Sequence, residues 1–190
     1  MKMNTITLAG TATLAALVVV FDYAMKYSGL KIPFPWLPFL KFDFTGIPIV
    51  LSLFLFGLIP GIFTSIIASV AILARSGQVV GSSMKGLAEF STILGMAVGL
   101  KLLKKFRMVG SFTTGITLRV FTMICFNLTL IYTGIMPLST SYANTPILFA
   151  LLSGAFNVFQ GALSILGGYS IYEAIKRRAP SLVKTNVLKY

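Results

Sequence analysis

Apolar runs long enough to form transmembrane helices follow one another along this chain, and no other feature restricts its fold as strongly. Hydrophobic residues make up 56% of the 190 residues and charged residues 11%, whereas about 25% charged is usual for a soluble domain. A helix that spans a bilayer needs about 20 apolar residues. The runs cover residues 4–26, 44–59, 61–75, 84–103, 111–133 and 146–174. We therefore predict an all-α integral membrane protein, with residues 1–190 forming a single domain of six transmembrane helices.

The number of spans depends on residues 44–75, where Pro60 and Gly61 interrupt the apolar run. We interpret this run as two short helices joined by a tight turn, followed by a short outer loop at residues 75–83. Six spans place both termini on the same side as the basic cluster around Lys104, and the loop around Pro137 on the other side. Because basic residues collect on the cytoplasmic side, we predict that the N and C termini are cytoplasmic.

Charge and residue usage exclude several classes of function. The net charge of +12 comes from basic residues placed between and after apolar runs, which is typical of topology signals, so no nucleic-acid binding is expected. The chain has no histidine and a single cysteine, Cys125, so we predict no metal site, no cofactor and no enzyme activity. It also lacks a phosphate-binding G-x-x-x-x-G-K-[ST] motif. Any transport must therefore draw energy from an ion gradient or another subunit.

The segment from Ser28 to Asp43 differs from the apolar runs because prolines and large aromatic residues alternate in it. Proline cannot continue a helix and restricts the residue before it. We therefore predict an irregular, aromatic-rich loop. It is either part of the aromatic belt at the membrane surface or a lid over a site.

A polar stripe runs along the last apolar segment, where Ser153, Asn157, Gln160 and Ser164 recur at spacings of three and four. This spacing places them on one face of a helix. An amide left unpaired in hydrocarbon costs several kcal/mol, so this face must meet either a partner helix or a ligand. Both readings remain open from the residues alone.

Three further polar residues lie within predicted helices. Glu89 is surrounded by apolar residues and must be either protonated or paired, with Lys85 one turn earlier as the candidate partner. Arg119 is expected to extend toward the inner membrane surface, whereas Asn127 lies deeper. We include Glu89, Lys85 and Asn127 among the candidate substrate-binding residues.

Short motifs along the chain together resemble one transporter family. They are Ala12-x-x-x-Ala16, FLKFDFTGIP at residues 39–48, FGLIPG at residues 56–61, Phe126-Asn127 and FNVFQG at residues 156–161. In this order they resemble the substrate-binding S component of energy-coupling factor (ECF) transporters, in particular its riboflavin-specific branch. The patterns of that branch are L-K-x-D-F-S-D-x-P, F-G-P-x-x-G and F-N-x-x-K-G. This chain has Thr45-Gly46 in place of Ser-Asp and Gln160 in place of lysine.

The resemblance implies a high-affinity riboflavin-binding subunit of an ATP-driven vitamin uptake transporter, spanning the cell membrane several times. It implies that Asn127 and Asn157 bond the pyrimidine edge of the flavin. The remaining substrate-site residues that it implies are Leu40, Phe42, Asp43, Thr45 and Gln160. Ala12 and Ala16 would dock the transmembrane coupling subunit, which acts with two cytoplasmic ATPase subunits.

Three alternatives remain open. The chain could be an S component for another vitamin, or a stand-alone secondary carrier coupled to protons or ions, for which Glu89 is the only acid in mid-span. It could also be a membrane scaffold that transports nothing and whose polar stripe only packs helices.

Overall fold

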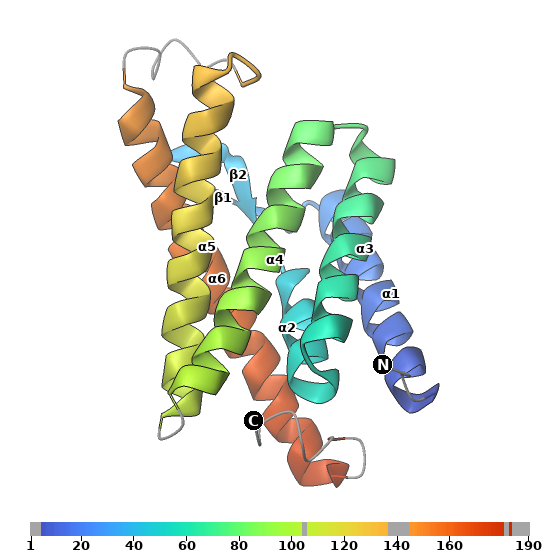
Figure 1. The fold of residues 1–190 in the computed structure, drawn as a ribbon. Coiled ribbons are helices and arrows are strands. Elements are labelled where there is room, and N and C mark those ends of the chain that lie inside the picture. Colours follow the sequence, from blue (N-terminus) through green and yellow to red (C-terminus); the bar gives the residue numbers. More distant parts are fainter. Residues whose placement is uncertain (1–4, 104–105, 137–144, 181–182, 184–190) are drawn as a thin grey trace.

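The computed structural model describes residues 5–103, 106–136, 145–180 and 183. Within these ranges the chain forms six helices and one two-stranded hairpin, so the predicted six-helix architecture is confirmed (Figure 1). The elements are α1 (Thr5–Tyr27), β1 (Ile32–Phe34), β2 (Leu37–Phe42), α2 (Gly46–Phe56), α3 (Leu58–Ser76), α4 (Val79–Leu102), α5 (Arg107–Tyr132) and α6 (Pro146–Arg178).

Four of the described helices, α1, α3, α5 and α6, are long and apolar enough to cross a membrane. Helix α2 has only 11 residues, which is about 17 Å of helix. Its residues are nevertheless almost all buried, and it contacts α1, α3, α4 and α6. Because other helices surround α2, its length need not match the thickness of the bilayer.

The break between α2 and α3 lies at Gly57 and not at Pro60–Gly61, which corrects the predicted boundary. Gly57 has φ +102°, a conformation that residues with a Cβ rarely adopt. Pro60 instead lies in the first turn of α3, where its missing N–H costs no helical hydrogen bond. The division of this run into two helices was predicted correctly.

Helix α4 begins at Val79, so the predicted loop at residues 75–83 is reduced to Gly77 and Gln78. The sequence did not indicate this earlier start of the helix, because Ser82 and Ser83 are polar and interrupt the apolar pattern of a membrane span. The Ser82 hydroxyl donates to the Gln78 carbonyl at 2.9 Å, within the first turn. The Ser82 hydroxyl is therefore satisfied within the first turn of the helix.

The aromatic-rich segment is a β-hairpin and not the irregular loop that we predicted. Strands β1 and β2 pair antiparallel, with Ile32 opposite Phe42 and an irregularity after Pro33. A two-stranded ribbon has only edge strands, and there proline is tolerated because its missing N–H can face outward. Phe34 and Leu37 are buried against Phe149 and Phe156 of α6, which anchors the hairpin on that helix.

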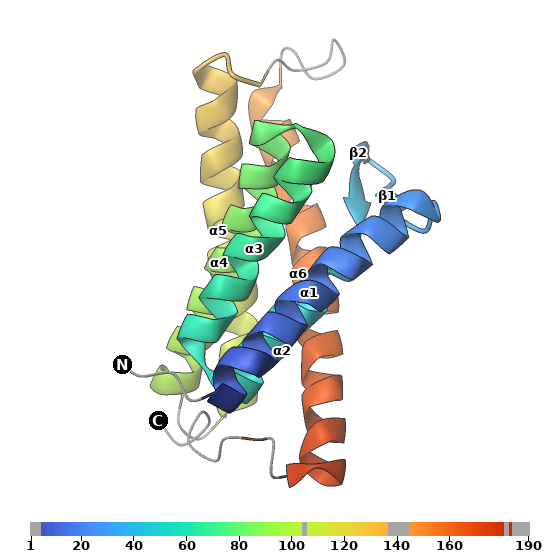
Figure 2. The same ribbon diagram turned by 90° about the vertical axis from the view of Figure 1, so that its right-hand side faces the viewer.

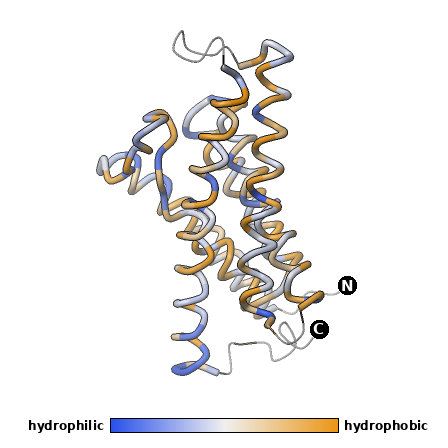
Figure 3. Tube along the Cα trace, turned by 90° about the vertical axis from the view of Figure 1, so that its left-hand side faces the viewer, coloured by the Kyte–Doolittle hydropathy of each residue, from blue (hydrophilic) through white to orange (hydrophobic). Residues whose placement is uncertain are grey.

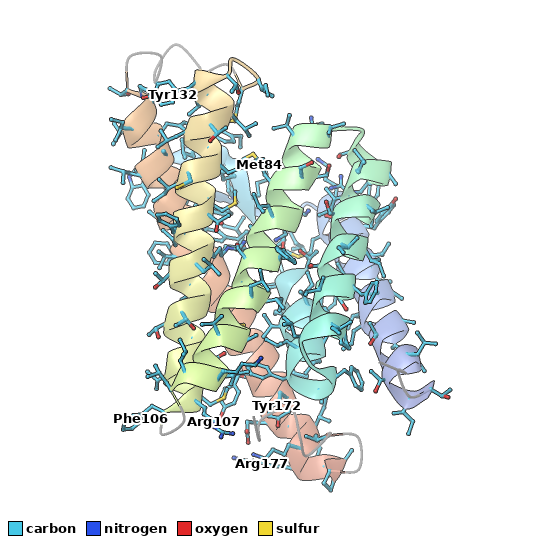
Figure 4. The ribbon with its side chains drawn as sticks, viewed as in Figure 1. Met84, Phe106, Arg107, Tyr132, Tyr172 and Arg177 are labelled. Carbon is cyan, nitrogen blue, oxygen red and sulfur yellow. The ribbon has the colours of Figure 1, made fainter. Side chains whose placement is uncertain are left out.

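The bundle has two distinct ends (Figures 1 and 2). The start of α1 and the end of α6 lie together at one end, here called the terminal end. The hairpin and the α3–α4 junction lie toward the other, the hairpin end. Figure 3 shows the last turns of α6 as hydrophilic, and Figure 4 places Arg107 and Arg177 at the terminal end. Lys104, Lys105 and Pro137 lie outside the described residues.

Candidate functional site

A cavity of about 630 Å³ lies toward the hairpin end, between β2, α4, α5 and α6. Its apolar walls include Phe39, Leu40, Met84, Met123 and Phe149, and Met84 is labelled on α4 in Figure 4. Its polar lining includes Asp43, Lys85, Arg119, Asn127, Ser153 and Asn157. This size, with mostly apolar walls and a few polar groups, is typical of a site for a small organic molecule.

The two predicted asparagines lie on facing helices of the cavity and are linked through Ser153. Asn127 Nδ2 donates to Ser153 Oγ at 3.0 Å and to the Met123 carbonyl at 2.7 Å. Asn157 Nδ2 donates to the Ser153 carbonyl at 2.8 Å. No described residue donates to Asn127 Oδ1, and Asn127 lines the cavity. This carbonyl oxygen is therefore an acceptor available to a ligand.

Arg119 points into the protein, so the expectation that it extends to the membrane surface was wrong. Its side chain is only 1% exposed and lines the cavity. Nε donates to Asn157 Oδ1 at 3.0 Å, and Nη1 donates to Thr92 Oγ1 at 3.0 Å. No described residue accepts from Nη2, which leaves donors for a ligand in the cavity.

Four charged side chains form a connected row at the cavity, and Asp43, Lys85 and Arg119 belong to its lining. Lys85 Nζ lies 2.9 Å from Asp43 and 2.9 Å from Glu89, which confirms that Glu89 is paired with Lys85. Arg119 Nη1 lies 3.2 Å from Glu89. Removing a charge from water costs several kcal/mol unless it is paired, and here two carboxylates meet two cations. These four side chains therefore connect the residue that follows the hairpin with α4 and α5, and their charges sum to zero.

Asp43 lies between the hairpin and α2, and Thr45 fixes its carboxyl group. Oδ1 accepts from the Thr45 hydroxyl at 2.6 Å and from the Thr45 N–H at 3.1 Å. Burial raises the pKa of this carboxyl, but Lys85 and Thr45 more than offset it, so the pKa of Asp43 lies below its ordinary value. The carboxylate is thus held ionised beside Lys85.

Gln160 does not line the cavity, because both ends of its amide bond the backbone of Asp43. Nε2 donates to the Asp43 carbonyl at 2.8 Å, and Oε1 accepts from the Asp43 N–H at 3.2 Å. Next to this clamp, a Cβ on Gly46 would come within 2.1 Å of Ser164 Oγ. The close approach of α2 to α6 explains why this chain has glycine at position 46.

The predicted substrate-site residues therefore fall into two groups. Five of them line the cavity: Leu40, Asp43, Lys85, Asn127 and Asn157. The other four lie outside its lining: Phe42, Thr45, Glu89 and Gln160. Sequence reasoning missed Arg119 as a site residue, although Arg119, Met123 and Asn127 are spaced by four and share one helical face.

The predicted docking residues Ala12 and Ala16 are exposed on α1. Ala15, between them, is buried with 3% exposure. Of these three alanines, only Ala15 packs inside the bundle.

Comparison with known proteins identifies a similar fold. No protein-family model and no curated sequence matches the chain. A solved structure described as the S component of a bacterial ECF transporter superposes with a TM-score of 0.68 and 22% identity, covering 90% of this chain and 96% of the other. This chain is therefore a multi-pass membrane protein with the fold of an ECF transporter S component.

Proposed function

We propose that this chain is the substrate-binding S component of an ECF transporter and that it captures riboflavin, or a closely related flavin, from outside the cell. The observation that supports this most is the cavity, whose lining combines Asn127, Asn157 and Arg119 with aromatic and methionine side chains. A flavin ring has one hydrogen-bonding edge and one apolar edge, and it needs both kinds of surface.

The polar groups of the lining complement the pyrimidine edge of the ring. Arg119 Nη2 can donate to a ring carbonyl, and Asn127 Oδ1 can accept from the ring N–H. The riboflavin-specific branch has a lysine where this chain has Gln160. Arg119 passes beside the next residue of α6, since a Cβ on Gly161 would lie 3.2 Å from Arg119 Cδ. The cation is then supplied by α5 in place of α6.

In this proposal all six helices cross the cell membrane, with both termini in the cytoplasm. The basic residues of the terminal end support this orientation, because Arg107 and residues 176–178 would then be cytoplasmic. The hairpin would cover the cavity from outside. A transmembrane coupling subunit would dock on Ala12 and Ala16, and two ATPase subunits would supply the energy.

A stand-alone carrier driven by protons fits the site less well. Glu89, the only acid within the cavity-forming helices that such a carrier could protonate in mid-span, is paired with both Lys85 and Arg119. Protonating it would leave two buried cations with a single carboxylate, which is costly.

Purification in detergent from cells grown with riboflavin tests the proposal. We expect a yellow preparation with flavin absorbance. Protein that has been freed of its ligand should quench riboflavin fluorescence in a saturable manner when the two are titrated. Mass spectrometry of the released ligand separates the alternatives. Another vitamin in its place would refute the flavin assignment but keep the S component, and a folded protein that binds no vitamin would refute both.

A further inference from the structure

A second hollow adjoins the ligand cavity at the hairpin end, and its polar lining is basic. It has a volume of about 300 Å³, and four cationic side chains line it: Lys26, Lys31, Lys41 and Arg75. We call it the basic pocket. Phe39 and Lys41 line both this pocket and the larger cavity, so the two adjoin at β2.

Asp22 neutralises only part of this charge. Its carboxylate is fully buried; Oδ1 lies 2.7 Å from Lys31 Nζ, and both oxygens accept from the Arg75 guanidinium. Lys26 and Lys41 are exposed and form no ion pair with any described residue. Four cations and one carboxylate leave three positive charges around the basic pocket.

This arrangement suits an anion with several oxygens. Like charges gathered around one hollow repel one another, and a bound anion relieves the repulsion. Asp22 holds Lys31 and Arg75 in fixed positions, so part of the ordering that binding requires is already present. The planar fork of an arginine matches phosphate oxygens, and lysines add point charges.

The basic pocket also lies on the side of the membrane where a cluster of basic residues is unexpected. In the orientation proposed above, on which this inference rests, the hairpin end faces outward, where basic residues are disfavoured. Tyr23 and Tyr27 are exposed on α1, which carries Lys26, and Trp36 is exposed in the turn between β1 and β2. Such aromatic residues collect at the level of the lipid head groups, so a phosphate at this depth can reach the pocket.

We propose that the basic pocket binds a phosphate group, carried either by a phosphorylated form of the captured solute or by the head group of an anionic lipid. Both sources present the same oxygens to the same cations. Sulfate or phosphate in solution is then a weak surrogate for either.

The test compares the full-length parent with a variant carrying Lys26→Gln and Lys41→Gln. A variant with Lys101→Gln and Arg178→Gln removes the same charge from the terminal end and serves as the control. One arm measures the affinities for riboflavin and for riboflavin 5′-phosphate by fluorescence quenching. A second arm compares thermal unfolding in nanodiscs of phosphatidylglycerol and of phosphatidylcholine. A third arm measures thermal unfolding with inorganic phosphate against chloride at equal ionic strength.

If the solute carries the phosphate, the parent should bind riboflavin 5′-phosphate about three- to tenfold more tightly than riboflavin, as one charge-assisted contact can give. If a lipid carries it, phosphatidylglycerol should raise the unfolding midpoint of the parent. In either case inorganic phosphate should stabilise, and the pocket variant but not the control should lose the effect.

The inference is overturned if all three arms show no phosphate preference, or if the pocket variant retains the preference of the parent. If the protein binds no flavin at all, the proposed function fails, while the lipid and inorganic phosphate arms still decide on the basic pocket.

Discussion

Arg119 on α5 and Asn157 on α6 are joined by a hydrogen bond of 3.0 Å from Nε to Oδ1. A buried cation therefore holds the carbonyl end of this amide, while its Nδ2 donates to the Ser153 carbonyl. Both residues line the cavity, and their orientation is set before any ligand arrives. Such preorganisation lowers the cost of binding.

We expect Asn127→Ala and Asn157→Ala each to weaken flavin binding by roughly ten- to hundredfold, because a lost partner leaves a buried polar group unsatisfied at about 1–3 kcal/mol. Fluorescence quenching titrations with purified variants measure this. Thr129→Ala is the control, since Thr129 is exposed on α5 and its hydroxyl donates to the Cys125 carbonyl of its own helix. If the asparagine variants lose stability but bind as tightly as the parent, these residues only join helices.

The pairing of Glu89 with Arg119 predicts a strong energetic coupling. Arg119→Met should destabilise the protein by about 3–5 kcal/mol, because it leaves Glu89 with one cation in place of two. Combining it with Glu89→Met should recover part of this loss. Thermal unfolding of the two single variants and the double variant gives the coupling energy.

The exposed pair Lys176 and Glu173 is the matched control for this cycle, with a separation of 3.3 Å. Its coupling should be below about 1 kcal/mol. Equal coupling in the two pairs would show that burial does not strengthen the contact between Glu89 and Arg119.

The clamp from Gln160 to Asp43 predicts an order among substitutions. Gln160→Leu loses both hydrogen bonds to the Asp43 backbone, whereas Gln160→Lys keeps a donor and loses the acceptor. Stability should therefore fall in the order parent, Gln160→Lys, Gln160→Leu, at about 1 kcal/mol for each bond lost. Thermal unfolding checks the order. A fully stable Gln160→Leu would mean that other contacts seat the hairpin.

Replacing Ala12 and Ala16 by leucine should abolish assembly with a coupling subunit and vitamin uptake. Both residues are exposed, so flavin binding to the isolated protein should change by less than about 1 kcal/mol. Ala15→Leu is the contrasting variant, because Ala15 is buried and overpacking typically costs about 1–3 kcal/mol. Co-purification, uptake and binding measurements separate the two effects. Normal assembly of the double variant would move the docking surface elsewhere.

The proposed orientation predicts opposite accessibility of the two ends. In a Cys125→Ser background, a cysteine at Gln78 should react with an impermeant thiol reagent on intact cells. A cysteine at Phe106, exposed at the terminal end (Figure 4), should react only after the cells are opened. The reverse pattern would place the termini outside.

Hydropathy predicted the helices well because each one must bury or expose its apolar side chains over many residues. Periodicity also predicted that Asn157 and Gln160 face inward, and both are buried. It could not predict what each one meets. Asn157 meets Arg119, whereas Gln160 meets the backbone of a residue 117 positions away. A face of a helix can be read from spacing, but its partner depends on how the helices pack.

Two predictions were wrong for the same reason, because each applied a rule that considers only the local sequence. Arg119 was assigned to the membrane surface because long cationic side chains usually extend there, but Glu89 on α4 offered a buried partner. The hairpin was missed because its prolines were considered only as residues that exclude a helix, whereas an isolated pair of strands tolerates proline at its edges. In both cases a contact distant in sequence decided the local outcome.

The clamp between Gln160 and Asp43 also determines when the protein becomes competent during synthesis. The hairpin and Asp43 emerge early, but α6 supplies both the amide that seats them and the residues Ser153, Phe156 and Asn157 of the cavity. A nascent chain with five helices therefore has neither a seated hairpin nor a complete binding site. In the proposed function, capture of a ligand would begin only after the last helix has packed, so chains that end before α6 should bind no solute.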